Sequence, residues 1–471
     1  MSTSDPTRLP AREAVRRLRA REVSPLELID AALTRIAAVD PLVNAVPTLC
    51  PERAREHARR IMAGRAPAGR LAGLPVLIKD LVEVEGVRST HGSPIFADHL
   101  PRASDWEIER IEAAGGIVLG KTNTPEFGAG ANTFNEVFGI TRNPWDLRLT
   151  CGGSSGGSAV ALATGMAWLA DGSDLGGSLR TPASFCGVVG LRPSPGRVPH
   201  GPGTLPFGTL SVNGPMARDV RDVALFLDVL AGFDPRDPLS HELPATTYAE
   251  SVEMPIRLRR VAFSADLGGI TPVDAEVAAL CGEATARFAD LGAGVENASP
   301  DLGSAVDVFT TLRAAQFAGA MEPLLDAHRD RLKPEVVWNI EHGLSLTAAQ
   351  IGRAERERGL LQRRMAQFLS DFDLLCCPAA IVPPFPVEQR YLAELNGHRF
   401  PSYIDWVSIN YAITLTGCPA LSLPCGFTAA GLPVGLQIVG PPRGEAKLLA
   451  AAAMLEARLG LAGSVPIDPK A

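Results

Sequence analysis

The stretch GGSSGGSAVALATGMAWLADGSDLGGSLR at 152–180 contains the pattern that decides the fold and the chemistry of this chain. A glycine-rich turn lies at each end, and between them come a helix-like segment at 158–165 and a strand-like segment at 167–170. Ser154 and Ser155 lie in the first turn and Ser178 in the second. A serine hydroxyl becomes a nucleophile once a neighbour removes its proton, and glycine turns let backbone N–H groups converge on a developing oxyanion. The stretch therefore predicts acyl-transfer hydrolysis.

A lysine upstream of the two turns is the candidate base. Lys79 ends the apolar run LPVLIK at 74–79 and is followed by Asp80. A free lysine has a pKa near ~10.4 and donates protons at neutral pH, but burial away from a carboxylate lowers that pKa by several units. If both residues lie on a strand, their side chains point to opposite faces, which keeps Lys79 from being held charged by Asp80. Lys79 and the two turns then supply base, nucleophile and oxyanion hole without a histidine.

Short apolar runs separated by Gly and Pro alternate with helix-like segments along much of the chain. This alternation favours an α/β architecture with a layered sheet. Because strands near both ends of the chain read as buried, one sheet that shares them and two separate domains both remain open. The strands are expected at 75–78, 116–119, 167–170, 373–377, 420–424 and 433–439.

Helix patterning dominates the N-terminal stretch and the middle of the chain. The N-terminal stretch reads as two helices, and the capping box that starts at Ser24 opens one that ends near Ala38. In the middle section, roughly 233–335, the periodicity is helical, and a long charged helix follows. Helices are expected at 105–114, 158–165, 272–291, 312–328, 347–369 and 445–459.

Composition and charge exclude several classes of function. The 471 residues are 46% hydrophobic and 21% charged, with a net charge of −7, so we expect no nucleic-acid partner. The basic run RRLRAR at 16–21 is expected to be a solvated helix face. The apolar run at 159–170 is too short to span a bilayer, so we expect no membrane partner. Eight cysteines without C-x₂-C spacing and the polar N-terminus MSTSDPTRLP predict a cytoplasmic location.

Two motifs give competing interpretations. GGIVLGKT at 115–122 fits the Walker A pattern of a nucleotide-binding module, but its apolar interior favours a buried strand that ends at Gly120. The G-x-S-x-G at 153–157 fits a nucleophile elbow, which needs a preceding strand, whereas 143–148 reads as a loop. The eight histidines form no evident site, and His91 and His99 lie in a loop-like stretch without clustered carboxylates. We therefore expect no metal and no cofactor.

Several stretches together resemble the amidase signature family, and they cover nearly the whole chain. The resemblance implies a single amidase domain over 1–471, built on one large mixed β-sheet with helices on both faces. Its expected parts are N-terminal helices at 8–63, a signature core at about 70–230, a helical section at about 233–370, and C-terminal strands and a helix at 371–460 that rejoin the sheet. The matching stretches are GLPVLIKD (73–80), GKTNTPEFG (120–128), TRNPWD (141–146), GGSSGGS (152–158), GSDLGGSLRTPASFCGVVGLRPS (172–194), GPMARDV (214–220), NYAITLTGCPALSLPCGF (410–427) and GLPVGLQIVGPP (431–442).

The resemblance also implies a role for each site residue. Ser178 matches the acylated nucleophile, Ser154 the bridging serine on a cis peptide, and Lys79 the base. An ion pair between Asp174 and Arg180 is expected to brace the second turn. The chain departs from the family pattern at Cys151, where proline or glycine is usual, and at Ser173, where threonine is commoner. The residues expected to form the oxyanion hole or to bind substrate are Leu175, Gly176, Gly177, Ser178 and Gly128. The residues expected to support the site are Ser155, Ser173, Asp174 and Arg180.

Some serines in and near the two turns can also be explained by an ordinary structural role. Ser155, Ser158 and Ser173 are each also explained as a helix cap or turn residue, and Ser158 is the N-cap candidate for the helix that follows. Pocket walls are expected from 128–138, from the helices at 312–342 and from 376–411. The aromatic residues expected there are Phe134, Trp338, Tyr403 and Trp406, which suggests room for an apolar or aromatic group.

The function that the resemblance implies is hydrolysis of the C–N bond of a small aryl or aliphatic amide through an acyl-enzyme. The expected partner is the small-molecule amide itself, and a homodimer stays open. A carbamate or ester hydrolase with the same triad is an alternative. So is a glutamine-hydrolysing amidotransferase subunit that needs a partner, and, from another class, the nucleotide-binding module at 115–122.

Overall fold

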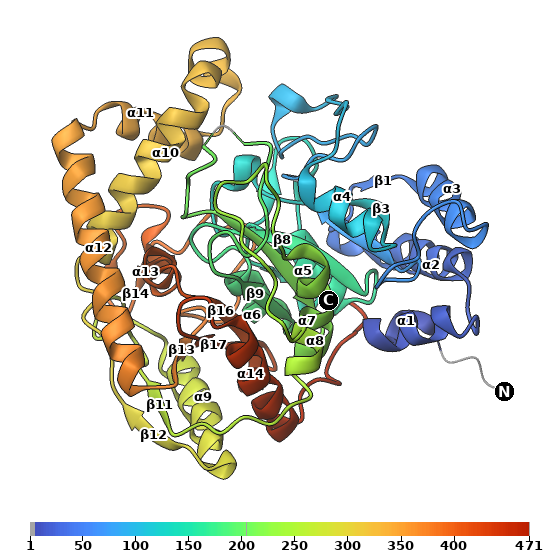
Figure 1. Ribbon diagram of the computed structural model, residues 1–471. Helices are drawn as coiled ribbons and strands as arrows, with labels where there is room; N and C mark the ends of the chain where they lie inside the picture. Colours follow the sequence, from blue (N-terminus) through green and yellow to red (C-terminus); the bar gives the residue numbers. More distant parts are fainter. Residues whose placement is uncertain (1–4, 204, 471) are drawn as a thin grey trace.

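One mixed β-sheet of eleven strands joins the two ends of the chain (Figure 1). The computed structural model describes residues 5–203 and 205–470, so the first four residues of the polar N-terminus lie outside it. The C-terminal strands lie beside the strands of the segment at about 70–230, because β9 pairs antiparallel with β16, with Leu191 opposite Leu421. Strands from near both ends of the chain therefore share one large sheet. In spatial order its strands are β1 (Thr48–Leu49), β3 (Ile117–Thr122), β2 (Pro75–Lys79), β8 (Leu169–Asp174), β10 (Val212–Ala217), β9 (Val189–Arg192), β16 (Ala420–Phe427), β17 (Pro433–Val439), β13 (Leu374–Pro378), β11 (Arg260–Phe263) and β12 (Gly294–Asn297).

The strands that carry the site are central and buried. β2 runs parallel to both β3 and β8, and all five of its residues are buried, which suits its nearly continuous apolar sequence. The expected strands are all present, but three run well beyond their expected ends, and one of these is β16, which continues to Phe427. β3 continues to Thr122, and β8 continues to Asp174 because it pairs with β10 as far as Val212. The first residues of the second glycine motif therefore belong to a strand.

Helices cover this sheet, with bounds that differ in part from the sequence expectation. The N-terminal stretch holds three helices and not two, although the capping box at Ser24 is present. The helix that it opens continues past Ala38 to Val43. The helix expected at 312–328 begins at Ala305. The helices are α1 (Ala11–Arg19), α2 (Pro25–Val43), α3 (Pro51–Met62), α4 (Trp106–Ala113), α5 (Gly156–Ala163), α6 (Arg180–Cys186), α7 (Val220–Leu230), α8 (Tyr248–Ser251), α9 (Ala275–Ala286), α10 (Ala305–His328), α11 (Pro334–Leu344), α12 (Ala348–Asp371), α13 (Ser408–Thr416) and α14 (Glu445–Leu459).

Two smaller corrections concern the ends of elements. The helix expected at 272–291 is α9 followed by a 3₁₀ turn at Arg287–Leu291. The segment 143–148 is not a loop, because β6 (Arg142–Asn143) and β7 (Asp146–Thr150) form a hairpin. The Asn143 side chain accepts from the Trp145 N–H and donates to the Thr150 carbonyl, which fixes the turn. The other short elements are β4 (Phe134–Asn135), β5 (Gly139–Ile140), β14 (Glu394–Leu395), β15 (His398–Arg399) and the 3₁₀ turns Pro6–Arg8, Pro94–Phe96, Glu126–Gly128, Arg329–Arg331 and Asp405–Val407.

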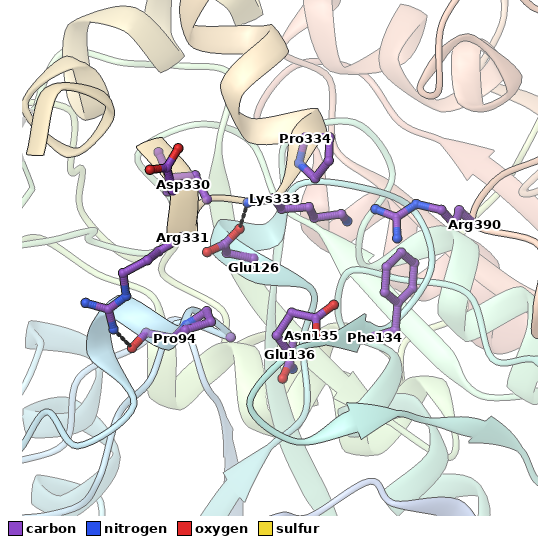
Figure 2. A pocket seen from close by; sticks show the side chains of 12 residues that line it. Pro94, Glu126, Phe134, Asn135, Glu136, Asp330, Arg331, Lys333, Pro334 and Arg390 are labelled. Atoms are coloured by element: carbon purple, nitrogen blue, oxygen red, sulfur yellow. Dashed lines mark hydrogen bonds between the residues drawn. The ribbon is translucent and has the colours of Figure 1, made fainter. Parts of the chain in front are cut away.

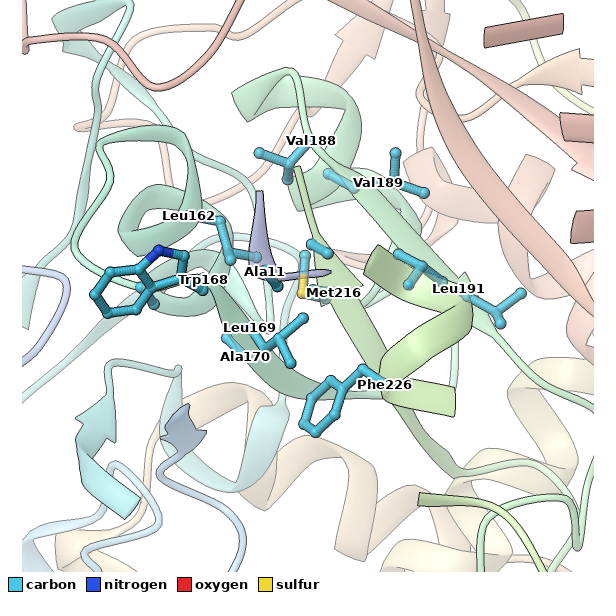
Figure 3. Close-up of a cluster of buried hydrophobic side chains, with 14 of the residues drawn as sticks. Ala11, Leu162, Trp168, Leu169, Ala170, Val188, Val189, Leu191, Met216 and Phe226 are labelled. Carbon is cyan, nitrogen blue, oxygen red and sulfur yellow. The ribbon is translucent and has the colours of Figure 1, made fainter. Parts of the chain in front are cut away.

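Two large clusters of buried apolar side chains lie on the sheet. One includes Trp168, Leu169, Leu191, Met216 and Phe226, which come from the central strands and α7 (Figure 3). Burying a large apolar side chain contributes about 1.5–3 kcal/mol. The second cluster joins α10, α12 and α13, the layer at the left of Figure 1. Among the residues that the structure describes, no helix combines the length and apolar character needed to cross a bilayer.

Candidate active site

The two glycine turns meet at the amino group of Lys79. This residue ends β2 and is fully buried. Its Nζ lies 2.7 Å from Ser154 Oγ, 2.9 Å from Ser155 Oγ and 2.9 Å from Ser173 Oγ. The structure thus brings together the lysine and serines of both turns, which are far apart in the sequence.

The surroundings of Lys79 favour its neutral form. Burial lowers the pKa of Lys79 to about 7, although the carboxylates of Asp171 and Asp174 oppose this effect. A neutral amine donates two hydrogen bonds and accepts one. The Ser155 hydroxyl can donate to the Ser173 carbonyl, 3.4 Å away, while it accepts from the amine. Ser154 Oγ, at 2.7 Å, is the hydroxyl nearest to Nζ and is positioned to donate to the lone pair of Lys79.

The nucleophile candidate, Ser178, lines the same cavity as Ser154, the candidate bridging serine. The peptide bond between Gly153 and Ser154 is cis, as the family resemblance implies. Ser178 is partly exposed and lines a cavity of about 90 Å³ together with Ser154 and Ser173. Gly177, just before it, has φ +114° and presses on Asn410, where a Cβ would come within 2.6 Å of that side chain. Glycine is therefore required for Ser178 to occupy this position.

Leu175, Gly176 and Ser178 of the second turn line the same cavity. Within 5–203 and 205–470, the N–H groups of Leu175, Gly176 and Ser178 have no hydrogen-bond acceptor. The Gly177 N–H donates to Asp174 Oδ1 at 2.9 Å and is not available to an oxyanion, which corrects that part of the expectation. Gly128, at φ +68°, also lines the cavity, and a Cβ there would lie 3.4 Å from Ser154 Oγ.

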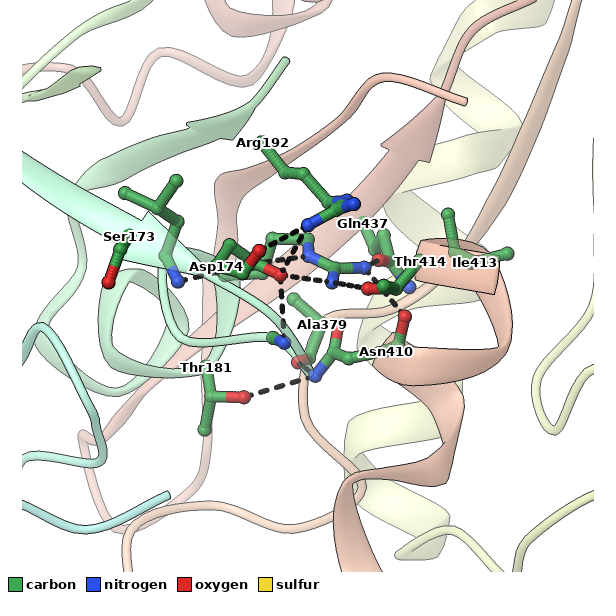
Figure 4. A network of polar contacts seen from close by, with 12 residues as sticks. Ser173, Asp174, Thr181, Arg192, Ala379, Asn410, Ile413, Thr414 and Gln437 are labelled. Carbon is green, nitrogen blue, oxygen red and sulfur yellow. Dashed lines mark hydrogen bonds and ion pairs between the residues drawn. The ribbon is translucent and has the colours of Figure 1, made fainter. Parts of the chain in front are cut away.

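A charged network around Asp174 braces the second turn (Figure 4). Asp174 pairs with Arg180 at 2.8 Å and with Arg192 at 3.3 Å, and all three side chains are fully buried. Burial alone would raise the pKa of Asp174, but the two guanidinium groups lower it well below its usual range. Arg180 also donates to the Asn410 carbonyl and to Gln437, which connects the turn to α13 and β17. The ion pair expected between Asp174 and Arg180 is present.

A buried carboxyl pair behind Lys79 was missed in the sequence. Asp171 Oδ1 accepts the backbone N–H of Lys79 at 2.6 Å, and Glu107 of α4 is hydrogen-bonded by Asn213 Nδ2. Both carboxyl groups are fully buried, and burial raises the pKa of Glu107 well above its usual value. Glu107 reads in the sequence as one of several acidic residues on an amphipathic helix, so only its tertiary position identifies it.

All three segments expected to form pocket walls contribute to the cavity at Ser178, but the four aromatic residues expected there do not line it. Trp338 is 38% exposed, and Trp406 is buried in the core. Tyr403 lies behind Arg313 and accepts a hydrogen bond from it. Phe134 lines a separate cavity of about 350 Å³, where Lys333 and Arg390 lie over its ring (Figure 2). Besides serines and glycines, the walls of the cavity at Ser178 are Leu81, Phe127, Ala131, Leu175, Phe309, Arg313, Phe317 and Ile404.

The competing motifs have structural explanations. The Walker-like segment forms β3 as far as Thr122, and Lys121 is fully buried in an ion pair with Asp80, so no phosphate-binding loop exists there. The nucleotide-binding alternative is therefore wrong. Ser158 is not an N-cap, because α5 begins at Gly156 and the Ser158 hydroxyl pairs with Thr122 Oγ1 at 2.7 Å.

Among the described residues, no histidine or cysteine lines the cavity at Ser178. His91 and His99 both contact Glu83, at 3.5 and 2.9 Å, so they do have a carboxylate neighbour. No group of three or more potential metal ligands occurs in the described part of the chain. Burial raises the pKa of the Cys151 thiol to about 12, so it is not a reactive thiolate.

Comparisons with known proteins find similar proteins along nearly the whole chain. A family model described as Amidase matches residues 27–449. The chain is 37% identical over 468 residues to an acylamidase of Rhodococcus erythropolis, covering 98% of this chain and 97% of that one. It is 37% identical over 477 residues to one of the subunits of the glutamyl-tRNA(Gln) amidotransferase of Moorella thermoacetica, covering 95% and 96%. Among solved structures, a 6-aminohexanoate cyclic dimer hydrolase complexed with substrate is similar with a TM-score of 0.89 at 31% identity, over 98% of this chain and 99% of that one.

Proposed function

This chain belongs to the amidase signature family, and on that premise we propose that it hydrolyses the C–N bond of a small aryl or aliphatic amide. The products are a carboxylate and an amine or ammonia. One observation carries the proposal: a buried lysine with a pKa of about 7 contacts Ser154, and Ser154 and Ser178 line one cavity. The partner is then the small amide, in line with the similarity to an acylamidase.

The reaction proceeds through two acyl transfers. Ser178 Oγ attacks the amide carbon while its proton passes to Ser154, and the Ser154 proton passes to the neutral amine of Lys79. The N–H groups of Leu175, Gly176 and Ser178 stabilise the tetrahedral oxyanion. As the C–N bond breaks, the proton returns through Ser154 to the leaving nitrogen. Water then attacks the ester on Ser178, with the same relay as base, and releases the carboxylate.

Ser155 and Ser173 hold the amine of Lys79 in line for this relay. Each places a hydroxyl 2.9 Å from Nζ, so the amine is fixed at three points. Carbamates and esters fit the same acylation chemistry, since the nucleophile and oxyanion hole act on any activated carbonyl. We propose them as further substrates of the same site.

A second candidate function is that of a glutamine-hydrolysing amidotransferase component. The relatives named as glutamyl-tRNA(Gln) amidotransferase subunits, at up to 37% identity, favour it. Purified protein alone would then hydrolyse glutamine slowly and aryl amides not at all, whereas an amidase acts on aryl amides without a partner. The rate of aniline release from acetanilide by the isolated chain separates the two functions.

We propose that the enzyme is located in the cytoplasm. We also propose a homodimer as its assembly state. All eight cysteines are free, in line with a reducing compartment. Light scattering of the purified chain, whose mass is 49.7 kDa, measures the assembly directly.

Replacement of Ser178 by alanine tests the proposed function. We expect Ser178→Ala to lower kcat/KM for an aryl amide at least about 10⁴-fold. Ser158→Ala is a matched control, since Ser158 is buried nearby but bonds Thr122 and not Lys79. Mass spectrometry after rapid quenching is expected to find the acyl group on Ser178 in the wild type. Near-normal activity of Ser178→Ala, or an acyl group on another residue, would disprove the assignment.

A further inference from the structure

Arg313 is a buried cation on the wall of the cavity that contains Ser178. It lies on α10, is only 4% exposed, and lines the cavity between two phenylalanines of the same helix. Phe309, Arg313 and Phe317 are spaced four residues apart, so they form one stripe on the helix surface. That stripe faces the cavity, and Arg313 is its single charge.

The guanidinium of Arg313 has only neutral partners. Its two terminal nitrogens donate to Asn339 Oδ1 and, at 2.6 Å, to Tyr403 Oη. It lies over the rings of Phe317 and Tyr403, 4.5 and 5.5 Å from their centroids. Among the described residues, no carboxylate lies within 4.0 Å of it. By contrast, the buried Arg180 and Arg192 share the carboxylate of Asp174.

A second cation lies close to the same cavity. Lys333 Nζ donates to the Ala129 carbonyl at 2.8 Å and would lie 3.4 Å from a Cβ on Gly130, a residue that lines the cavity. The nearest carboxylate to this amino group, in Glu335, is 4.0 Å away. This side of the cavity is therefore positively charged, while Leu81, Phe127 and Ile404 make other parts of the wall apolar.

An unpaired buried charge is costly to a fold unless it is compensated by a ligand. A guanidinium has five N–H donors, of which the described residues occupy two, and its planar fork matches a carboxylate. We propose that Arg313 binds a carboxylate of the substrate, so that the preferred substrates are amides that bear a carboxylate in addition to the scissile bond. This inference rests on the proposed function, because the same cavity holds Ser178.

Matched substrates test the inference on the wild-type enzyme. One pair is 4-acetamidobenzoate and 4-acetamidoacetophenone, which carry the carboxylate or a methyl ketone on the amine side. The other pair is 4-anilino-4-oxobutanoate and 4-oxo-N-phenylpentanamide, which carry it on the acyl side. A charge-assisted hydrogen bond predicts that kcat/KM is about tenfold to a hundredfold higher for the carboxylate in one of the two pairs. The pair that responds identifies the side of the amide that faces Arg313.

Variants separate the role of Arg313 from that of the general positive charge. We expect Arg313→Met to lower the carboxylate-to-ketone ratio of kcat/KM about tenfold to a hundredfold, mainly through KM, and Arg313→Lys to retain part of it. Arg353→Met, the same substitution at an exposed position of α12, is expected to keep the wild-type ratio. Lys333→Met is expected to lower the ratio less than Arg313→Met.

The outcomes distinguish this inference from the proposed function. Hydrolysis of the ketones without a preference for either carboxylate overturns the inference and leaves the amidase function intact. A ratio that Arg313→Met does not change overturns it as well. If the wild type releases no amine from any of the four compounds, the amidase function is disfavoured. Calorimetric binding of the same pairs to the wild type and Arg313→Met then decides the inference: tighter binding of a carboxylate that Arg313→Met abolishes supports it, and equal binding rejects it.

Discussion

Two fully buried lysines lie on neighbouring strands of the sheet, yet their surroundings are opposite in kind. Lys79 ends β2, and Lys121 lies on β3 opposite Ile78 in the parallel register. Lys121 Nζ lies 2.9 Å from Asp80 Oδ1 and 2.9 Å from Ser89 Oγ. Within the described part of the chain, Lys79 Nζ has three hydroxyl groups and no carboxylate within hydrogen-bond distance. The difference shows that the partners of a buried lysine, and not its burial alone, decide whether it can act as a base.

The acidic residues near Lys79, which could stabilise its charged form, form their hydrogen bonds with groups other than its amino group. Asp80 follows it in sequence but binds Lys121 and the Thr90 N–H. Asp171 accepts the backbone N–H of Lys79 and not its amine. Glu107 shares its buried site with Asp171, and burial favours the protonated form of Glu107 by raising its pKa. These arrangements leave Lys79 with a lowered pKa in a fold that contains several buried carboxyl groups.

Removal of each lysine in turn gives the largest contrast. We expect Lys79→Met to lower kcat/KM at pH 7.5 about 10³-fold or more, since the variant lacks the proposed general base. It should also stabilise the fold, because a lysine held at a pKa of about 7 costs about 5 kcal/mol, only part of which its hydrogen bonds offset. Lys121→Met leaves Asp80 buried and unpaired, and should lower the free energy of unfolding by about 3–5 kcal/mol. Amide hydrolysis and urea unfolding measure the two effects.

This pair of variants has clear contrary outcomes. Nearly normal activity of Lys79→Met would exclude it as the base. Loss of stability in Lys79→Met as large as in Lys121→Met would mean that the two lysines are held in the same way.

The pH dependence of activity and of stability tests whether Lys79 is neutral at pH 7 and above. Because only neutral Lys79 accepts a proton, kcat/KM is expected to fall tenfold per pH unit below about 7 and to level off above it. The free energy of unfolding should also depend on the protonation of Lys79. Between pH 7 and 10.5 the unfolded chain binds the lysine proton and the folded chain does not. The free energy of unfolding should therefore rise with pH in this window by about 1.4 kcal/mol per unit at most, from this residue.

Lys79→Met is the control for the stability effect. Its unfolding free energy should lack this pH-dependent contribution, so the difference between wild type and variant should shrink as the pH rises from 7 to 10.5. A difference that is constant over this range, or a kcat/KM that does not change between about pH 5.5 and 8, would contradict a depressed lysine pKa.

The hydroxyl groups around Lys79 are expected to have smaller effects. We predict that Ser155→Ala and Ser173→Ala each lower kcat/KM about tenfold to a hundredfold, because the amine loses one of its three fixed contacts. Each loss also removes a hydrogen-bond acceptor of the charged amine, so the pKa seen in the pH profile should move down. Ser158→Ala should change neither quantity noticeably. Equal effects of all three variants would point to a packing defect in place of a role at Lys79.

The sequence carries the parts of this site that are local. The glycine turns around Ser154 and Ser178 and the apolar run before Lys79 could be recognised because their chemistry depends on neighbouring residues. The family resemblance supplied the assignment of one role to each. The strands could be placed from their apolar cores, while their full length depends on pairing, as at Asp174 opposite Val212.

The parts that were missed depend on contacts between distant segments. Glu107 and Arg313 look like ordinary helix residues until the fold places Glu107 beside Asp171 and Arg313 in the wall of the cavity at Ser178. The Gly177 N–H was expected at the oxyanion, but the carboxylate of Asp174 accepts it. Trp338 and Trp406 were expected in the pocket by their aromatic character alone, which does not say which face of a helix meets the cavity.

Titration of Lys79 by NMR is the most direct test of the central claim that it is a neutral base. The chain contains only five lysines, so lysine labelled with ¹³C at Cε gives a spectrum that single variants can assign. The signal that disappears in Lys79→Met is expected to titrate with a pKa of about 7. A signal that titrates above about pH 10 would show that Lys79 is charged at neutral pH and would contradict its role as the base.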